Sequence, residues 1–250
     1  MKNNQERKTN SMAVSIFLPG YNEEKIVKEH LLKVYNYVKK KSDYFEIVMV
    51  DDGSKDKTPK IVGELSKEYK NIKLARFDNG PSRRENLAKA MANAKYDIVC
   101  FMDLHLGTPI HYLDELIKGI EEGNDICIGS RRLKESKVKR GIVRNTISWF
   151  YHTGLHLLFR SKISDYQCGF KAFKKSKFKL LSKEAGYDDK FIRGWFWDAE
   201  MLFLAENKRM KIKEIPIEWN ARKESRFNMK RELKMLKYVF SLALKHNKKH

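Results

Sequence analysis

Short stretches rich in β-branched and aromatic residues alternate with longer amphipathic stretches over the first hundred residues of the chain. The short stretches predict four strands, at Ala13 to Leu18, Phe45 to Val50, Ile72 to Phe77 and Asp97 to Met102. Apolar residues at helical spacing predict the helices between them, at Glu23 to Lys41, Lys55 to Tyr69 and about Arg84 to Ala94. Helices that connect successive strands in this way form βαβ units, so we expect an α/β fold in which helices flank a mostly parallel sheet.

The length and the composition allow one compact α/β domain or two small ones. The chain has 250 residues, of which 42% are hydrophobic, and no internal repeat or low-complexity linker divides it. We expect the α/β domain to cover residues 12–225, after a polar tail at 1–11 and before a basic amphipathic helix at 226–250. In that last segment the apolar positions at helical spacing are Leu233, Leu236, Phe240 and Leu244.

A large excess of positive charge indicates an anionic partner. The chain has 52 Lys and Arg residues against 32 Asp and Glu residues, which gives a formal net charge of +20. Such a charge fits nucleic acid, a nucleotide sugar or an acidic membrane surface. No helix-turn-helix, zinc-finger, RNP or KH signature occurs in the sequence, and this argues against nucleic acid as the partner.

Two further features favour a cytoplasmic protein that does not span a membrane by itself. The cysteines, Cys100, Cys127 and Cys168, are widely spaced and form no CxxC pair, which is typical of a reducing compartment. The polar start lacks the apolar core of a signal peptide, and no run of about 18 apolar residues occurs.

Polar residues cluster where three of the predicted strands end. The first strand leads into PGYNEE at 19–24, the second into DDGS at 51–54 and the fourth into DLH at 103–105. Each cluster alone has an ordinary explanation, because Pro, Gly, Asn, Asp and Ser are common in turns and at helix N-caps. Ligands of parallel α/β sheets bind beyond the carboxyl ends of the strands, so the three clusters together favour a binding site there.

Six stretches of the chain, in order from Ser15 to Trp219, resemble the motifs of a known family. They are SIFLPGYNEE, EIVMVDDGSKDKT, ICIGSRR, ISDYQCGFKAF, GWFWDAEMLFLAE and KEIPIEW. The chain resembles the family 2 glycosyltransferases with the GT-A fold. Within that family it is most similar to the dolichyl- and polyprenyl-phosphate sugar synthases, in particular the dolichyl-phosphate glucosyltransferases. The resemblance implies transfer of a hexose from a UDP- or GDP-linked donor to a dolichyl or polyprenyl phosphate, with inversion at the anomeric carbon.

The resemblance also implies a nucleoside site at the first two strand ends. The residues that correspond to this site are Pro19, Tyr21, Glu23, Asp51 and Asp52. Their chemistry suits the task, because a carboxylate accepts hydrogen bonds from a base or a ribose hydroxyl, and a tyrosine ring stacks on a base.

At the end of the fourth strand the chain departs from the Asp-x-Asp motif of the family. Asp103 corresponds to the first carboxylate, whereas His105 replaces the second. In the family, a divalent ion at this motif stabilises the departing nucleoside diphosphate as a Lewis acid. Mg²⁺ prefers oxygen ligands and imidazole suits Mn²⁺ better, so we expect Mn²⁺ to be favoured over Mg²⁺. In the alternative, His105 is a surface residue that holds no metal. The protein could then be a degenerate transferase that binds nucleotide sugar without turnover.

A second departure follows the third strand. Relatives have a small, Gly- and Ala-rich segment there, whereas this chain has Arg83 and Arg84. Guanidinium groups bind phosphate in bidentate fashion, so the two arginines are candidates to hold the donor diphosphate. The alternative is that both are solvated residues of the first helical turn.

Basic residues are concentrated in a loop and helix at about 131–160, which we interpret as the acceptor side. The resemblance implies that Arg131 and Arg144 hold the acceptor phosphate, and Ser148 follows Arg144 at a spacing that places both on one helix face. A phosphomonoester has a second pKa of about 6 and is mostly a dianion at neutral pH. Such an acceptor is a nucleophile without help from a general base.

Two further segments match positions at or near the active site of the family. In ISDYQCGF these are Asp165 and Gln167, and in WFWDAE it is Asp198. A transferase that acts on a sugar hydroxyl needs a carboxylate as general base, and Asp198 would be that base in this alternative. In the ordinary interpretation Asp198 caps the helix that follows it.

A lipid acceptor requires contact with a membrane. The aromatic stretch with basic ends at 144–162 and the segment at 226–250 both suit helices in the headgroup plane, although a helix with an apolar stripe also packs on its own domain. Lys and Arg near an anionic surface contribute roughly 1 kcal/mol each. We expect peripheral binding at the cytoplasmic face of the membrane, or recruitment by a separate membrane protein.

Overall fold

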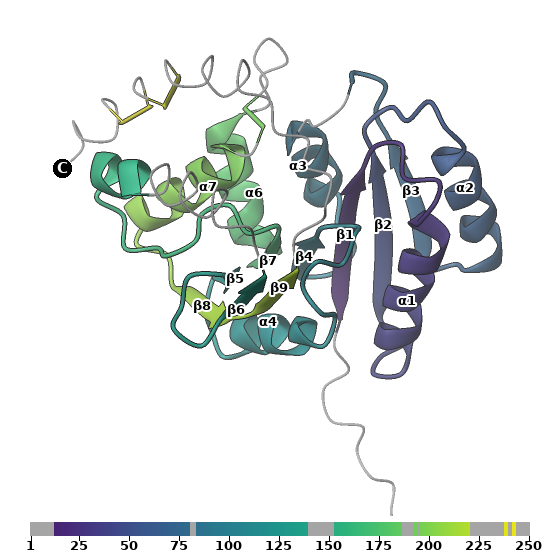
Figure 1. The fold of residues 1–250 in the computed structure, drawn as a ribbon, viewed down its shortest axis with the longest axis horizontal. Helices are drawn as coiled ribbons and strands as arrows, with labels where there is room; N and C mark the ends of the chain where they lie inside the picture. Colours follow the sequence, from purple (N-terminus) through teal and green to yellow (C-terminus); the bar gives the residue numbers. More distant parts are fainter. Residues whose placement is uncertain are drawn as a thin grey trace, which may run out of the picture.

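A seven-stranded sheet forms the centre of the part of the molecule that the structure describes (Figure 1). The structure is a computed structural model and describes residues 13–80, 84–139, 153–186, 193–194, 196–220, 238–239 and 242–243. The strands of the sheet are β1 (Val14–Gly20), β2 (Phe45–Asp51), β3 (Ile72–Arg76), β4 (Ile98–Met102), β5 (Ile126–Ser130), β7 (Phe170–Lys174) and β8 (Ile212–Pro216). Their spatial order is β3-β2-β1-β4-β7-β5-β8, and a separate parallel pair consists of β6 (Lys137–Lys139) and β9 (Glu218–Asn220).

Parallel pairing predominates in the sheet, as the sequence predicts. β1 pairs in parallel with β2 and β4, β2 with β3, and β5 with β8. Only β7, among the strands described, runs antiparallel, and it lies between β4 and β5. Met102 at the end of β4 is paired with Phe170 at the start of β7. The loop before β7 therefore lies at the carboxyl end of β4, where a ligand is expected.

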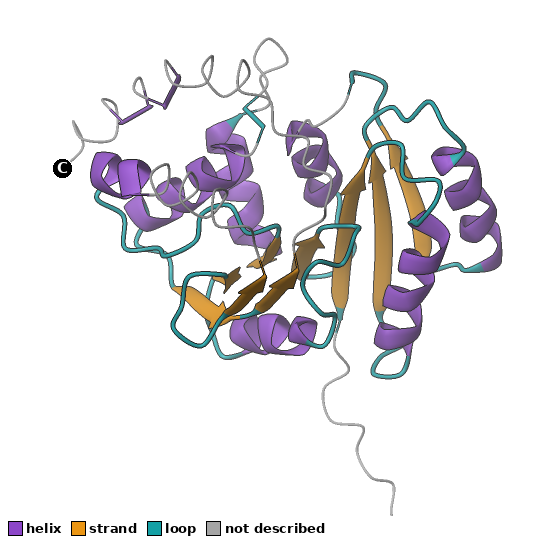
Figure 2. Ribbon diagram, viewed as in Figure 1, coloured by secondary structure: helices purple, strands orange, loops and turns teal. Residues whose placement is uncertain are grey.

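Helices cover both faces of the sheet (Figure 2). They are α1 (Val27–Lys39), α2 (Thr58–Glu68), α3 (Arg84–Ala92), α4 (Tyr112–Glu121), α6 (Lys175–Ala185) and α7 (Phe196–Asn207), and residues 153–159 are also helical. Successive side chains of a strand point to opposite faces. Ile16 and Leu18 accordingly join the core under α1, α2 and α4, whereas Phe17 joins the core under α3, α6 and α7.

The four strands and three helices predicted from the sequence are confirmed. α1 and α2 begin three or four residues later than predicted, at Val27 and Thr58. The polar residues that precede them form turns, because their side chains bond backbone groups of the neighbouring loop instead of continuing the helix.

The described residues near the end of the chain pack on the core that contains α7. Val239 and Ala243 are buried in this core, and the Tyr238 hydroxyl donates a hydrogen bond to Glu200 Oε1 (2.7 Å). The four apolar residues predicted to form a stripe at 226–250 lie outside the described residues. Within the part of the chain that is described, no helix has the length and apolar character needed to cross a bilayer.

Candidate active site

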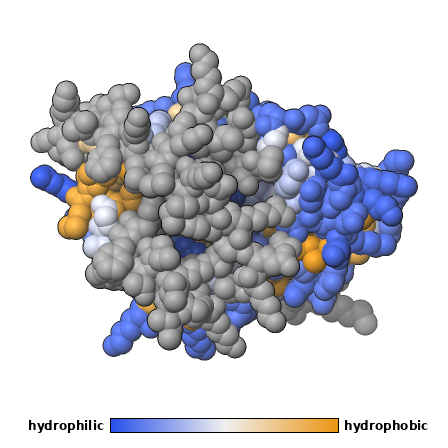
Figure 3. Space-filling model, turned by 45° about the horizontal axis from the view of Figure 1, so that its top comes forward, coloured by the Kyte–Doolittle hydropathy of each residue, from blue (hydrophilic) through white to orange (hydrophobic). Residues whose placement is uncertain are grey.

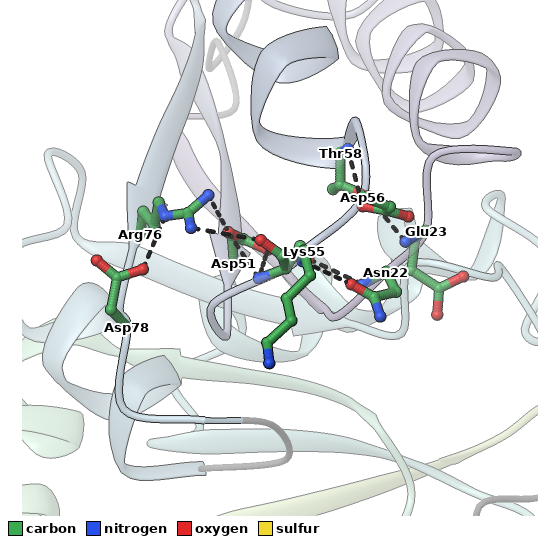
Figure 4. A network of polar contacts seen from close by, with 9 residues as sticks. Asn22, Glu23, Asp51, Lys55, Asp56, Thr58, Arg76 and Asp78 are labelled. Carbon is green, nitrogen blue, oxygen red and sulfur yellow. Dashed lines mark hydrogen bonds and ion pairs between the residues drawn. The ribbon is translucent and has the colours of Figure 1, made fainter.

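The loops after β1 and β2 are joined to each other by hydrogen bonds (Figure 4). The backbone N–H of Asn22 donates to Ser54 Oγ, and Asn22 Oδ1 accepts from the backbone N–H of Lys55, both at 2.8 Å. The backbone N–H of Glu23 donates to Thr58 Oγ1 at the start of α2, also at 2.8 Å. Asn22 has a φ of 54°, a left-handed conformation that asparagine tolerates better than most residues. The two loops thus form one unit.

Asp51 lies beneath these loops rather than on their surface. Its side chain is fully buried, Ser54 donates its backbone N–H to Oδ1 (3.2 Å), and the Arg76 guanidinium lies 3.5 Å from Oδ2. Gly53, which lies between Asp51 and Ser54 in the sequence, has a φ of 79°, and a Cβ there would lie 3.0 Å from the carbonyl oxygen of Phe77. These contacts fix the conformation of the loop that carries Asp52.

Asp52 connects the second loop to α3. Its Oδ1 accepts a hydrogen bond from Asn86 Nδ2 (2.9 Å), and only 6% of the residue is exposed. At the neighbouring strand end, Pro19 and Tyr21 are half-buried and Glu23 is buried. The structure brings all five residues predicted for the nucleoside site to the carboxyl ends of β1 and β2, with Asp51 buried beneath the loops.

Asp103 follows β4 and lies against the loop before β7. Its backbone N–H donates to the carbonyl oxygen of Gly169 (3.0 Å), and its side chain is 30% exposed. A Cβ on Gly169 would lie only 2.6 Å from Asp103 Cγ. The absence of a side chain at Gly169 therefore allows the Asp103 carboxylate to occupy this position.

A pocket opens beside Asp103. Its lining residues are Met102, Asp103, Leu106, Gly107, Thr108, Gly169, Phe170 and Trp219. The empty space there, about 210 Å³ including the part open to solvent, is small. His105 borders it, because a Cβ on Gly107 would lie 3.1 Å from His105 Nε2 and 3.2 Å from Trp219 Nε1. The pocket suits one end of a ligand.

Arg131 reaches the same pocket through Trp219. The Arg131 Cζ atom lies 5.4 Å from the centroid of the Trp219 ring, a distance at which a guanidinium and an indole attract each other. Arg131 also forms a bidentate pair with Asp165, from Nε to Oδ2 (2.6 Å) and from Nη2 to Oδ1 (2.8 Å). Nη1 takes no part in this pair. Asp103, predicted for the donor side, thus lines the pocket, and Arg131, predicted for the acceptor side, lies against Trp219, another residue of its lining.

Asp198 lies at the base of the site in the first turn of α7. Its side chain is 1% exposed and lies between two cations, with Arg84 Nε 3.2 Å from Oδ2 and Lys171 Nζ 3.5 Å from Oδ1. Arg84 also lies 3.9 Å from Asp103. The structure therefore brings Arg84, Asp103 and Asp198 together, and Arg84 is not a solvated residue.

The remaining predicted residues are placed as follows. Gln167 is half-buried in the loop before β7, and its backbone N–H donates to Asp165 Oδ1 (3.2 Å). Arg83, Arg144 and Ser148 lie outside the described residues.

A comparison with known families assigns the chain to one of them. The sequence model described as glycosyl transferase family 2 matches residues 15–181, more than half of the chain. The chain belongs to this family. As a family 2 glycosyltransferase it is an enzyme that transfers a sugar.

Curated relatives of this glycosyltransferase cover most of its length. Dolichyl-phosphate beta-glucosyltransferase ALG5A of Trichomonas vaginalis is 32% identical over 94% of this chain and 74% of that protein. The dolichyl-phosphate beta-glucosyltransferase of Saccharomyces cerevisiae is 27% identical over 87% of this chain and 70% of that protein. Glycosyltransferase AglD of Haloferax volcanii is 30% identical over 88% of this chain, which spans only 35% of AglD.

Solved structures confirm the predicted GT-A fold. Glucosyl-3-phosphoglycerate synthase from Mycobacterium tuberculosis, in complex with UDP, has a TM-score of 0.67 at 16% identity and covers 94% of this chain and 80% of its own. The same synthase with Mn²⁺, UDP and phosphoglyceric acid has a TM-score of 0.65 at 17% identity over 93% and 77%. At these identities the similarity concerns the fold alone.

The residues of the pocket fit a divalent ion that is bound together with a diphosphate. Asp103 exposes its carboxylate there, and His105 Nε2 lies beside Gly107, another lining residue. In the described part of the chain, no group of three or more His, Cys, Asp or Glu side chains could hold a metal by itself. A carboxylate and an imidazole would leave the other coordination positions to diphosphate oxygens and water.

Three residues of the site were missed as individual candidates in the sequence. Trp219 lies in the matched KEIPIEW motif and Gly169 in DYQCGF, but a tryptophan or a glycine in a motif carries no sign of what it contacts. Lys171 alternates with buried apolar residues in β7, and strand periodicity therefore places it on the α7 face. Strand periodicity is thus the sequence signal that could have identified Lys171.

The Arg131–Asp165 pair should make the protein sensitive to acid. Burial by itself raises the pKa of Asp165, but the charge of Arg131 and its hydrogen bonds lower this pKa well below its usual range. A depressed carboxyl pKa stabilises the fold above the unfolded-state value of about 4, and this contribution is lost as the pH falls further.

Asp165→Asn is expected to lower the free energy of unfolding by roughly 2–3 kcal/mol near neutral pH, because it leaves the buried Arg131 charge without its partner. Urea unfolding of both proteins at about pH 5 and about pH 3 measures the effect. We expect the difference to shrink by about 1 kcal/mol at the lower pH. A difference that is constant or grows on acidification contradicts this account.

Proposed function

We propose that this family 2 glycosyltransferase moves a hexose from a UDP- or GDP-linked donor to a dolichyl or polyprenyl phosphate. The observation that carries the proposal is that Asp103 and Trp219 line one pocket and that Arg131 lies against Trp219. A carboxylate suited to a metal-bound diphosphate thus lines the pocket, and a cation suited to a second phosphate lies behind one of its walls. The names of the Trichomonas and yeast relatives support this acceptor.

On the donor side, we assign the nucleoside to the joined loops after β1 and β2. The proposed contacts are Pro19, Tyr21, Glu23 and Asp52, with the diphosphate near Arg83 and Arg84. Asp51 belongs to this site as a positioning residue, because its carboxylate is buried against Ser54 and Arg76.

Asp103 and His105 would hold a divalent ion, with Mn²⁺ favoured over Mg²⁺ because imidazole suits Mn²⁺ better. The bound ion supplies Lewis-acid stabilisation of the leaving diphosphate. Glucosyl-3-phosphoglycerate synthase has been solved with Mn²⁺ or with Mg²⁺ together with UDP, and this supports a divalent ion in a protein of this fold.

On the acceptor side, Arg131 would orient the lipid phosphate, together with Arg144 and Ser148. A phosphate oxygen attacks the anomeric carbon, the bond from that carbon to the diphosphate oxygen breaks, and the nucleoside diphosphate leaves. The attacking phosphate is mostly a dianion at neutral pH and has no proton to lose. Asp198 is buried between two cations, so it lacks the access that a general base for a sugar hydroxyl requires.

The test is a transfer assay with defined acceptors. The protein is incubated in detergent with Mn²⁺, dolichyl phosphate and a panel of labelled UDP- and GDP-sugars, and the lipid is then extracted and analysed. We expect label in a lipid-phosphate sugar from one donor, and none when dolichol replaces dolichyl phosphate. Donor binding without product for any lipid phosphate, or transfer to a sugar hydroxyl, contradicts the proposal.

Arg131→Ala separates the acceptor role from a donor role. If Arg131 holds the acceptor phosphate, the variant raises the KM for lipid phosphate while calorimetry shows nearly unchanged affinity for the nucleoside diphosphate. The opposite ordering would assign Arg131 to the donor.

The helical stretch at 153–159 is the described element best suited to touch a membrane. Leu157 is 73% exposed there, whereas Leu155 and Phe159 bury its other face in the core. His156 Nδ1 and the Tyr166 hydroxyl share a hydrogen bond of 2.9 Å, which connects the stretch to the loop before β7. Most of the described surface in Figure 3 is hydrophilic, so the exposed Leu157 is a candidate membrane contact. Docking at the cytoplasmic face, directly or through a membrane protein, would then supply the lipid.

Leu157→Asp is expected to weaken binding to vesicles that contain anionic phospholipid by about tenfold, since inserting one leucine contributes about 1.5–3 kcal/mol. Vesicle co-sedimentation measures the change. Tyr44→Asp is the matched control, because Tyr44 is 57% exposed but precedes the amino end of β2, whereas the site lies at the carboxyl ends of the strands. Equal binding by the wild type and Leu157→Asp would refute this contact.

A further inference from the structure

Arg84 occupies the centre of a group of charges that lies between the pocket and the core. It is the first residue of α3, and only 13% of its side chain is exposed. Nε lies 3.2 Å from Asp198 Oδ2, and Nη2 lies 3.9 Å from Asp103 Oδ1. Cζ lies 5.6 Å from the centroid of the Phe101 ring, which packs beneath it. The guanidinium therefore connects a fully buried carboxylate to the one that lines the pocket.

The two carboxylates that contact Arg84 differ in whether a second cation lies beside them. Asp198 has a second cation, because Lys171 Nζ lies 3.5 Å from its Oδ1 and is itself 1% exposed. Asp103 is 30% exposed to the pocket, and among the described residues Arg84 makes its one ion pair within 4 Å. Among the described residues, Arg84 is thus the nearest positive charge to the carboxylate that would carry the metal.

A guanidinium at this position has two consequences for a diphosphate site. Its charge is permanent, since burial lowers the pKa of Arg84 but Asp198, Asp103 and Asp52 outweigh burial and raise it. It attracts the diphosphate directly, without a metal. It also repels a divalent ion that approaches Asp103, and it shares the carboxylate that such an ion needs.

We propose that Arg84 is a built-in counter-cation for the donor diphosphate that competes with the divalent ion for Asp103. The proposal rests on the function proposed above, in that it assigns a role within the donor site. It states that the protein binds a nucleoside diphosphate partly without metal and binds Mn²⁺ more weakly because of Arg84. A residue that serves only to neutralise Asp198 would do neither.

The experiment compares the wild type with Arg84→Met, a substitution that keeps a side chain of similar volume and removes its charge. Electron paramagnetic resonance of free Mn²⁺ measures metal affinity without nucleotide. Calorimetry with UDP and with GDP, in EDTA and then in saturating Mn²⁺, measures nucleotide affinity. We expect Arg84→Met to bind Mn²⁺ about tenfold more tightly and to lose about tenfold or more of the nucleotide affinity in EDTA.

Two further variants keep the test decisive. Arg84→Lys retains the charge and should bind Mn²⁺ as weakly as the wild type. If Arg84→Met does not fold, the double variant Arg84→Met, Asp198→Asn removes one charge of each sign and should still bind Mn²⁺ more tightly. Unchanged Mn²⁺ affinity in the variants that lack the charge, or wild-type nucleotide binding that EDTA abolishes, overturns the role of Arg84. If the wild type binds neither UDP nor GDP under any condition, the proposed function itself fails.

Discussion

Gly169→Ala is expected to reduce the transfer rate by about 100-fold or more while the fold remains intact. The new methyl group would lie 2.6 Å from Asp103 Cγ, so the carboxylate has to leave its place in the pocket. Displacing a catalytic group by about 1 Å is enough for a loss of that size. The measurement is kcat with the donor found in the transfer assay, together with the Mn²⁺ affinity, which should fall in parallel.

Gly63→Ala is the matched control for this substitution. Gly63 lies within α2, and a Cβ there meets no atom within 4 Å. An alanine in a helix interior stabilises by up to about 1 kcal/mol relative to glycine, so this variant should keep full activity and unfold no earlier. If Gly169→Ala also keeps full activity, Asp103 does not act from the position that the structure gives it.

Arg193→Met is expected to lower the free energy of unfolding by about 3–5 kcal/mol, because it removes the cation between two buried carboxylates. Arg193 Nε donates to Glu85 Oε1 and Nη1 to Glu200 Oε2, both at 3.0 Å, and all three side chains are at most 4% exposed. Nη1 also donates to the carbonyl oxygen of Ala185 (2.7 Å). Urea unfolding at neutral pH measures the loss.

An exposed ion pair provides the comparison. Lys213 and Glu122 are each 40% exposed, and solvent screens their attraction, so Lys213→Met should leave the unfolding midpoint nearly unchanged. A similar small effect for Arg193→Met would show that the buried cluster does not hold α3 and α7 together.

The elements of the fold follow from local pattern. The apolar spacing within 14–102 is enough to place β1 to β4 and the three helices between them, because one face of each element is buried in a core. The position of β7 does not follow, because it pairs antiparallel with strands distant in the sequence. No local feature of 170–174 specifies that pairing.

The candidate site follows from the sequence only where its residues come from strand ends. Asp52 and Asp103 lie together at the carboxyl ends of the strands, as predicted, because parallel strands end on the same side of a sheet. A motif does not predict the direction of a side chain. The side chain of the adjacent Asp51 points into the protein, toward Arg76. The contact of Arg131 with Trp219 joins residues 88 positions apart in the chain, and only tertiary packing creates it.

The central claim is that one cavity brings two phosphorylated substrates together, and phosphorus NMR with a paramagnetic nucleotide tests it most directly. The substitution-inert chromium(III) complex of the nucleoside diphosphate is bound to the protein, and a short-chain polyprenyl phosphate is added. We predict strong broadening of the acceptor phosphate resonance, and its loss in Arg131→Ala. An acceptor phosphate that binds the wild type but stays unbroadened beside the bound complex would contradict the claim.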